Sequence, residues 1–222
     1  MAQYVDEFRG TDHLVYAPVL ADNNETTGAE GTIGYVTGTV SVLAPVAEIS
    51  KTVETASDTK YYDNKPAITI NAEGADTITL TVPALDLPTL AAITGKTYDS
   101  TTGAFMDGEA TPSYFALGYR LRLTDGTYRY VWRYKGSFAI PDETSATENA
   151  STDSNNQQLT YTGIDTIHTF TKPNASQKAL VVDERDGKAD VSSFFDQVTT
   201  CDTLEAASGA AVVDETTPAN NG

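Results

Sequence analysis

Apolar and polar residues alternate along much of the chain, which predicts a protein built mainly from β-strands. Between Ile68 and Ile70, and again from Ile78 to Val82, every second residue is aliphatic and the residues between are threonines. This period of two places the aliphatic side chains on one face of a strand. The intervening segment Asn71–Asp76 is rich in turn-forming residues. We therefore expect a hairpin over residues 68–82 with its turn in that segment.

A second hairpin is predicted from Phe115 to Phe138, because Asp125-Gly126 lies between two alternating runs. Asp-Gly is favoured in two-residue type I′ loops, where both residues take positive φ. Such a loop would create one apolar and aromatic face. The expected cross-strand pairs on that face are Leu123 with Tyr128, Leu121 with Tyr130, Tyr119 with Trp132, and Leu117 with Tyr134.

The opposite face of this hairpin would carry more than a third of the basic residues of the chain. Arg122 would lie across from Arg129, and like charges directly opposite each other are unfavourable. Acidic groups of the same or a neighbouring subunit should therefore neutralise this face, which we expect to be a subunit-contact surface or a surface salt-bridge face. Its basic residues are Arg120, Arg122, Arg129, Arg133 and Lys135.

Two short helices are predicted beside the strands. The first begins at Asp86, has Pro88 in its first turn and ends at Gly95. The second begins at Asp190, because the apolar residues that follow have the spacing of one buried helical stripe. That stripe consists of Val191, Phe194, Phe195 and Val198. Further strands are expected at Leu14–Ala17, Thr39–Leu43, Val46–Thr55, Leu159–Phe170 and Ala179–Val182.

Three stretches are too polar to belong to a compact core, namely Ala21–Gly38, Glu143–Gln158 and Asp202–Gly222. Long polar segments of this kind are typical of functional loops and terminal arms. We expect one domain over residues 1–200, which includes an N-terminal arm at 1–12 and a loop at 21–38. Residues 201–222 would form an acidic C-terminal arm or extension.

The charge of the chain excludes several classes of protein. Its 222 residues include 14 basic and 31 acidic ones, which gives a net charge of −17. A protein that binds nucleic acid over a broad surface needs a basic face, and an anionic membrane would repel this chain.

The single cysteine, Cys201, excludes an internal disulfide. Met1–Gly10 shows no features of a signal peptide, and no apolar run is long enough to span a bilayer.

Candidate chemical groups are few. His13 and His168 are the two histidines, and neither accompanies a serine-nucleophile motif. Gly95-Lys96-Thr97 lacks the first glycine of a phosphate-binding loop. Asp183–Asp190 lacks the ligand spacing of a calcium loop. We therefore expect no catalytic, cofactor-binding or metal-binding residues, and a protein that is not an enzyme.

Several segments, in order along the chain, resemble one known family. They are Tyr4–Gly10 with Asp12–Tyr16, Ala47–Thr52, Thr59–Pro66, Leu85–Leu90 with Gly95-Lys96, Tyr130–Gly136, Leu159–Gly163, and Gly187–Val191 with Phe194–Asp196. Together they resemble the phi13-type major tail proteins, or tail tube proteins, of long-tailed bacteriophages (siphoviruses). The resemblance covers residues 4 to about 200, and the tail after Leu204 is similar to an added extension.

The resemblance implies a fold and an assembly. The fold would be a β-sandwich or small barrel with one or two short helices at its side, long loops and terminal arms. Subunits would form rings, usually of six, that stack into a hollow tube in the virion after synthesis in the host cytoplasm. The implied partners are other copies of the chain, the tape measure protein, the tail terminator and the distal tail protein. DNA would pass through without specific binding.

The acidity of the chain suits such a conduit, because a lumen that attracted phosphate would retain DNA. An acidic lumen is therefore our hypothesis for the wall of the tube. The alternative from another class is a non-catalytic β-sandwich module of a phage or bacterial surface adhesin, which binds carbohydrate. An adhesin would expose aromatic side chains over a groove and would not form tubes. An enzyme would instead require clustered titratable residues.

Overall fold

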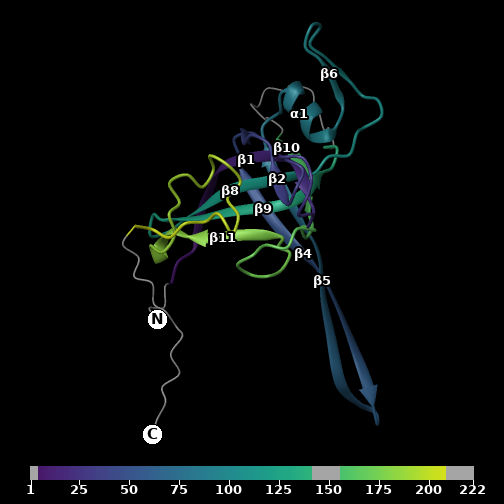
Figure 1. Ribbon diagram of the computed structural model, residues 1–222, viewed down its shortest axis with the longest axis vertical. Coiled ribbons are helices and arrows are strands. Elements are labelled where there is room, and N and C mark those ends of the chain that lie inside the picture. The colour runs from purple at the N-terminus through teal and green to yellow at the C-terminus, as the bar shows by residue number, and fades with distance from the viewer. Residues whose placement is uncertain (1–4, 142–155, 209–222) are drawn as a thin grey trace, which may run out of the picture.

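The computed structural model describes residues 5–141 and 156–208, and it is mainly β (Figure 1). The predicted polar stretch 143–158 and the extension 201–222 thus lie mostly outside the described residues. The elements are β1 (Phe8–Asp22), β2 (Tyr35–Thr37), β3 (Ser41–Val42), β4 (Glu48–Tyr62), β5 (Lys65–Val82), α1 (Leu87–Thr94), β6 (Thr97–Asp99), β7 (Ala104–Met106), β8 (Phe115–Leu123), β9 (Tyr128–Phe138), β10 (Gln157–Gly163), β11 (Ala179–Asp183) and the 3-10 turn η1 (Glu184–Asp186).

One nine-stranded antiparallel sheet forms the body, with the strand order β2-β1-β8-β9-β10-β5-β4. In addition, β11 pairs with β9 and β3 pairs with β1, while β6 and β7 form a small separate sheet. Alternation along the strands gives the sheet two apolar faces, and each face has its own core. Strands from both halves of the sheet meet in the first core, so the sheet curves around it. This arrangement confirms the expected mainly β, sandwich-like fold.

The first core, within the curved sheet, is aliphatic and aromatic. Its fully buried members include Leu14, Ile78, Leu80, Leu117, Leu159 and Tyr161. The second core lies on the other face of β1, β8 and β9, under residues 170 and 189–204. It is centred on Trp132 and Tyr134 of β9, which are both 0% exposed. Burial of the large side chains of the two cores, one on each face of the sheet, is the main apolar stabilisation of the body.

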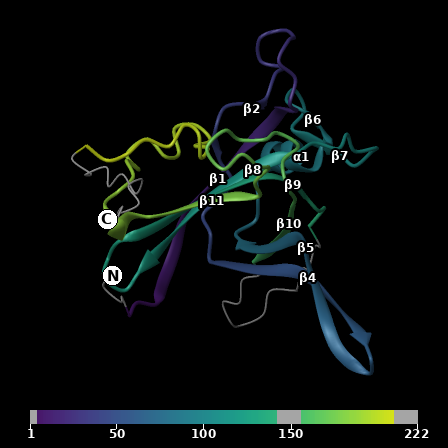
Figure 2. The same cartoon turned by 60° about the horizontal axis from the view of Figure 1, so that its bottom comes forward.

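The hairpin predicted at residues 68–82 is wrong. Residues 65–82 form one continuous strand, β5, which pairs along its whole length with β4. The turn lies instead at Asp63-Asn64, whose φ angles of 51° and 61° fit the type I′ geometry that Asn and Asp tolerate. Polar residues 71–76 remain extended because β4 supplies their backbone hydrogen bonds. The resulting β4–β5 hairpin projects far from the body in both views (Figures 1 and 2).

The hairpin of β8 and β9 forms as predicted, but its register is shifted by one residue. Leu121 pairs with Arg129 and Tyr119 with Val131, because the loop has three residues rather than two. The N–H of Leu123 donates to the carbonyl of Thr127 across the loop, and Gly126 takes φ 94°. This geometry is a turn followed by a glycine bulge. A shift of one residue exchanges the faces of one strand relative to the other. The predicted all-basic face therefore does not exist.

The first predicted helix is confirmed as α1. It follows Asp86, begins at Leu87 and is capped by Gly95 in the left-handed conformation with φ 69°. The Asp86 side chain makes no cap hydrogen bond, so its backbone alone starts the helix. Figure 1 shows α1 at one end of the sheet, beside β6.

The second predicted helix, from Asp190, is wrong, and residues 192–198 form consecutive turns. Phe194 and Val198 are nevertheless buried in the second core, as their spacing indicates. The carbonyl of Phe194 accepts hydrogen bonds from the Trp132 indole, at 2.9 Å, and from the Thr199 hydroxyl. In an α-helix the carbonyl of Phe194 would instead accept the backbone N–H of Val198.

The other predicted strands differ mainly in extent. The strand at 39–43 shortens to β3, and the strand at 159–170 ends at Gly163, with one isolated bridge at Phe170. The expected loop at 21–38 contains β2, which pairs with β1 and extends the sheet. Residues up to 207 contact the body, since Ala207 donates its N–H to the carbonyl of Lys188. The division at residue 200 stays a prediction.

We predict that Gly95→Ala strongly destabilises the protein. A Cβ at this position would lie 2.0 Å from the carbonyl oxygen of Thr111, and the φ of 69° already disfavours alanine. The loss should be about 2–4 kcal/mol in the free energy of unfolding, measured by urea denaturation. Gly103→Ala is the matched control, because its φ is 71° but its nearest non-neighbouring atom is 3.8 Å away. Equal losses for the two variants would contradict the role of the close contact.

Candidate functional site

The five basic residues predicted as a contact surface lie on both faces of the β8–β9 ribbon. Arg120 lies across from Tyr130, while Arg129 and Arg133 lie across from Leu121 and Leu117 on the other face. Arg122 pairs with Tyr128 rather than with Arg129, so the predicted like-charge pair does not occur. The one-residue register shift causes this distribution. The structure therefore does not bring the five residues together on one surface.

Arg120 and Arg129, which lie near the loop of the β8–β9 hairpin, are both neutralised by carboxylates of the same chain. The Nε of Arg120 is 2.5 Å from the Oδ1 of Asp12, and its guanidinium stacks over the ring of Tyr128. Arg129 donates to the Oδ2 of Asp183 at 2.7 Å. Hydrogen bonds from Arg185, together with those from Arg129, outweigh burial and lower the pKa of Asp183 to about 2. Both arginines thus join β1 or β11 to the central hairpin.

Lys135 forms a buried ion pair with Asp22 at the end of β1. Its Nζ is 2.6 Å from the Oδ2 of Asp22, and the two side chains are 8% and 6% exposed. The same carboxylate accepts the backbone N–H groups of Ile167 and His168 at 2.8–2.9 Å. Burial alone would raise the pKa of Asp22, but these hydrogen bonds and the lysine charge lower it overall. The pair fastens the 164–168 segment to the sheet.

Arg133 reaches the first core side of the sheet and contacts Asp76. Its Nη1 is 2.9 Å from the Oδ2 of Asp76, which is 2% exposed. Lys51 lies 3.2 Å from the same oxygen. Four of the five predicted residues therefore have carboxylate partners in their own chain. Arg122 is exposed, and no ion pair is found for it among the described residues.

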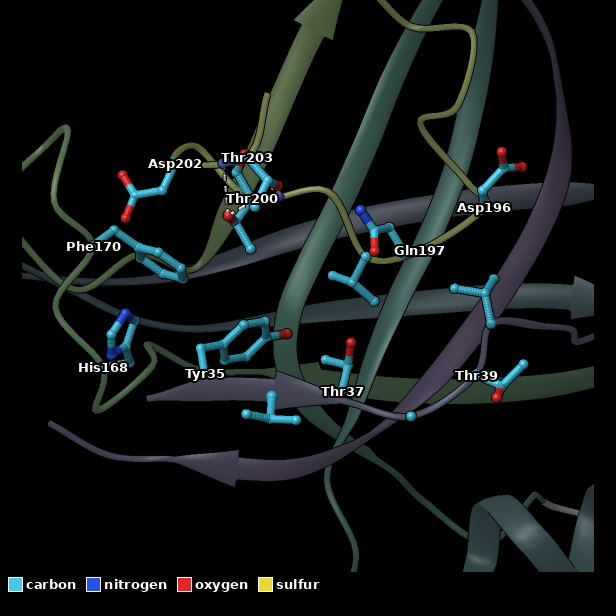
Figure 3. A pocket seen from close by; sticks show the side chains of 14 residues that line it. Tyr35, Thr37, Thr39, His168, Phe170, Asp196, Gln197, Thr200, Asp202 and Thr203 are labelled. Carbon is cyan, nitrogen blue, oxygen red and sulfur yellow. Dashed lines mark hydrogen bonds between the residues drawn. The ribbon is translucent and has the colours of Figure 1, made fainter. Parts of the chain in front are cut away.

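The two histidines lie apart and serve different local contacts. His13 takes φ 57° at an irregularity of β1 and stacks on Phe195 at 4.6 Å between ring centroids. His168 borders a pocket of about 680 Å³ together with Tyr35, Phe170 and Asp202 (Figure 3). His168 Nδ1 is bonded to the carbonyl of Asn23, and the Tyr35 hydroxyl donates to the carbonyl of Tyr134. The aromatic and imidazole groups of this pocket therefore support neighbouring loops.

The carboxylate of Asp202 in this pocket is also occupied. It accepts the backbone N–H groups of Thr171 and Lys172 at 2.7 and 2.8 Å. Such hydrogen bonds fix the 170–175 turn against residues 200–203. The imidazole of His168 and the carboxylate of Asp202 are thus both hydrogen-bonded to neighbouring backbone groups.

The remaining sequence candidates have structural roles. Gly95 caps α1, and Lys96 pairs with Asp107. Residues 184–186 form the turn η1 in the segment that faintly resembles a calcium loop. Within residues 5–141 and 156–208, no cluster of three or more metal-binding side chains is found. None of the helices in that part of the chain is long and apolar enough to cross a membrane.

The β4–β5 hairpin is the feature that the sequence interpretation missed. Its outer part is exposed, and Ile68 and Ile70 are 51% and 54% exposed on one face. Their cross-strand partners on this face are Lys60 and Asp58, whereas Thr59 and Thr69 pair on the other face. Two tyrosines, Tyr61 and Tyr62, are also exposed at the tip. The alternation of Ile68 and Ile70 with Thr69 correctly indicates a strand, but its partner is β4 and not residues 78–82 as predicted.

We predict that stability falls in acid as the paired aspartates become protonated. A carboxyl whose pKa is lower in the folded state stabilises the fold above its unfolded pKa of about 3.9, and this contribution is lost as the pH falls through the folded pKa. For Asp183, that range runs from about 4 to about 2. Asp183→Asn should cost about 1–2 kcal/mol at pH 7 and much less at pH 2.5.

Urea unfolding of both proteins at these two pH values measures the effect. Asp58→Asn is the control, because Asp58 is 63% exposed in its pair with Lys60 on the free hairpin. It should change the free energy of unfolding by less than about 0.5 kcal/mol at either pH. A pH-independent loss for Asp183→Asn would contradict the linkage.

Comparison with known proteins identifies the family. The family model described as phage tail tube protein matches residues 35–199, which is most of the chain. That range includes the β4–β5 hairpin, α1 and the central β8–β9 ribbon. A search of curated proteins finds no match. The match agrees with the mainly β fold and with its curved antiparallel sheet. The chain therefore belongs to the phage tail tube protein family.

Proposed function

We propose that this chain assembles with further copies of itself into stacked rings, six subunits to a ring, which form the hollow tail tube that delivers phage DNA. Family membership supports a structural role in the virion tail. The single observation that carries the assembly mode is the projecting β4–β5 hairpin, on which Ile68 and Ile70 are 51% and 54% exposed. Residues 1–200 would form the tube domain, and residues 201–222 an extension.

The physical argument starts from the weakness of an isolated hairpin. A two-stranded ribbon is marginally stable by itself in water. Here 51–54% exposure of Ile68 and Ile70 adds apolar surface that association would remove from water. The outer edge of β4 also ends the sheet, so its backbone groups are open to another chain. A second copy of the chain could bury the isoleucine face and pair with the backbone groups at the edge of β4.

The intrachain ion pairs bear on the role of charge in the tube. Most of the basic ribbon is already neutralised by carboxylates of the same subunit, so its charge does not offset the acidity elsewhere. A chain of net charge −17 would then line the lumen with repulsive groups and let DNA slide. We place the tape measure protein in the lumen during assembly, and the tail terminator and distal tail protein at the two ends. Synthesis would occur in the host cytoplasm.

Arg122 is the basic residue of the ribbon that we retain as a direct contact between subunits. It is exposed and has no partner carboxylate among the described residues. Because the chain has a net charge of −17, an exposed arginine is attracted to the acidic groups of a neighbouring copy. The other four residues, Arg120, Arg129, Arg133 and Lys135, would then support the contact from within the subunit.

We predict that Ile70→Asp prevents tube formation while the subunit stays folded. The change puts a charge on the proposed contact face, where burial would require its desolvation. Negative-stain electron microscopy of the purified wild-type protein should show tubes or rings, and the variant should show single particles. Thr69→Asp is the matched control on the other face of the same strand and should retain tubes. Equal loss in both variants would contradict the choice of face, and uniform small particles for the wild type would favour the adhesin alternative.

We also predict that Arg122→Glu weakens assembly. Loss of one contact worth about 1 kcal/mol would raise the critical concentration for tube formation roughly fivefold. Sedimentation at increasing protein concentration measures this quantity, and the gap between variant and wild type should narrow in high salt. Lys188→Glu, at an exposed lysine outside the ribbon, is the control with the same charge change. A critical concentration equal to that of the wild type would exclude Arg122 from the contact.

A further inference from the structure

The β4–β5 hairpin leaves the body at Asp76. From Val82 back to Asp76, β5 is paired on one side with β10 and on the other side with β4. Beyond Asp76, residues 65–75 are paired with β4 alone. The pairing of β4 with β5 is irregular at the same level, between Val53 and Thr55. Asp76 is therefore the last residue of the hairpin that the sheet holds from both sides.

Three cations from three different segments surround the carboxylate of Asp76. Arg133 of β9 and Lys51 of β4 approach its Oδ2 at 2.9 and 3.2 Å. Lys178, which precedes β11, lies 3.9 Å from its Oδ1. The Asp76 side chain is 2% exposed, and among the described residues its Oδ1 has no hydrogen-bond partner. Moving this buried carboxylate away from the three cations would separate opposite charges in a medium of low dielectric constant, which is energetically costly.

Lys178 also contacts residues of the hairpin beyond Asp76, where the hairpin has left the body. Its Nζ pairs with the Oε1 of Glu73 at 3.1 Å and donates to the carbonyl of Gly74. One side chain of the body thus holds residues on both sides of the place where the hairpin becomes free.

Small rotations at this root would be amplified at the tip. The free arm of 11 residues, 65–75, is about 36 Å long at the usual rise per residue of a strand. A rotation of about 10° at the root would move the tip by about 6 Å, which is nearly two residues of strand. Docking on a neighbouring copy in one register therefore requires a fixed root angle.

We propose that Asp76, Lys51, Arg133 and Lys178 form a positioning cluster that sets the angle at which the β4–β5 hairpin projects. Lys178 is the member that transmits the angle, because it holds Glu73 and Gly74 outside the sheet as well as Asp76 inside it. The role of the angle in assembly rests on the proposed function. The cluster itself is argued from the single subunit and is tested there.

The test measures the distribution of distances between the hairpin and the body. Spin labels are attached to Ala67→Cys, near the tip, and to Val181→Cys, an exposed position on β11, in a Cys201→Ser background. Pulsed electron paramagnetic resonance is recorded on unassembled subunits. Lys178→Gln should broaden the distribution by about 6 Å, the displacement of the tip for a root rotation of about 10°. Lys178→Arg keeps the charge and should restore the narrow distribution.

Two further variants separate positioning from general stability. Glu73→Gln alters a side chain that is 62% exposed, so the fold should tolerate it, yet it removes the negative charge from one contact of Lys178. It should broaden the distribution to a smaller extent. Lys172→Gln removes a lysine whose Nζ donates to the carbonyl of Leu204, far from the hairpin root in sequence, and should leave the distribution unchanged.

The outcomes decide between the two proposals. A narrow distribution in Lys178→Gln, or equal broadening in Lys172→Gln, would overturn the positioning cluster. If Lys178→Gln does not fold, a wild-type distribution in Glu73→Gln overturns it instead. Broadening accompanied by normal tube formation would uphold the cluster and overturn the proposed contact through the hairpin. Broadening with loss of tubes would support both.

Discussion

The register of β8 against β9 is the constraint on which the rest of the body depends. The three-residue loop that ends in Gly126 sets this register, and every second side chain of β9 then enters one core or the other. Trp132 and Tyr134 fill the second core as a result. The same alternation places Arg133 on the face of the first core, where it pairs with Asp76, while Lys135, in the irregular part of the ribbon, pairs with Asp22. Packing and charge compensation therefore follow from one loop.

Local signals predicted the local parts of this fold. The helix α1 depends on Pro88 in its first turn and on Gly95 at its end, and both act within the helix itself. Asp125-Gly126 likewise predicts a hairpin, although the dipeptide occurs in both two- and three-residue loops. The register depends on which loop forms. That choice is decided by packing on both faces of the ribbon, which the hairpin sequence does not contain.

The misassigned elements depend on partners that are distant in the chain. Residues 71–76 have the composition of a turn, and only pairing with β4 keeps them extended. Residues 191–198 have a helical apolar spacing, but the Trp132 indole competes for the carbonyl of Phe194. The candidate basic residues were identified from the sequence, while their partner carboxylates lie 54 to 113 positions away. Composition could predict that acidic partners exist, but not which ones.

The long hairpin has a consequence for the thermodynamics of association. Its strands are hydrogen-bonded to each other along their whole length in the single subunit. Disordered arms must lose conformational entropy when they bind, and this loss subtracts from their affinity. An arm that is already ordered avoids most of that loss. Polymerisation of such subunits would have a smaller entropic barrier at its first step, so growth could begin from a dilute pool of monomers.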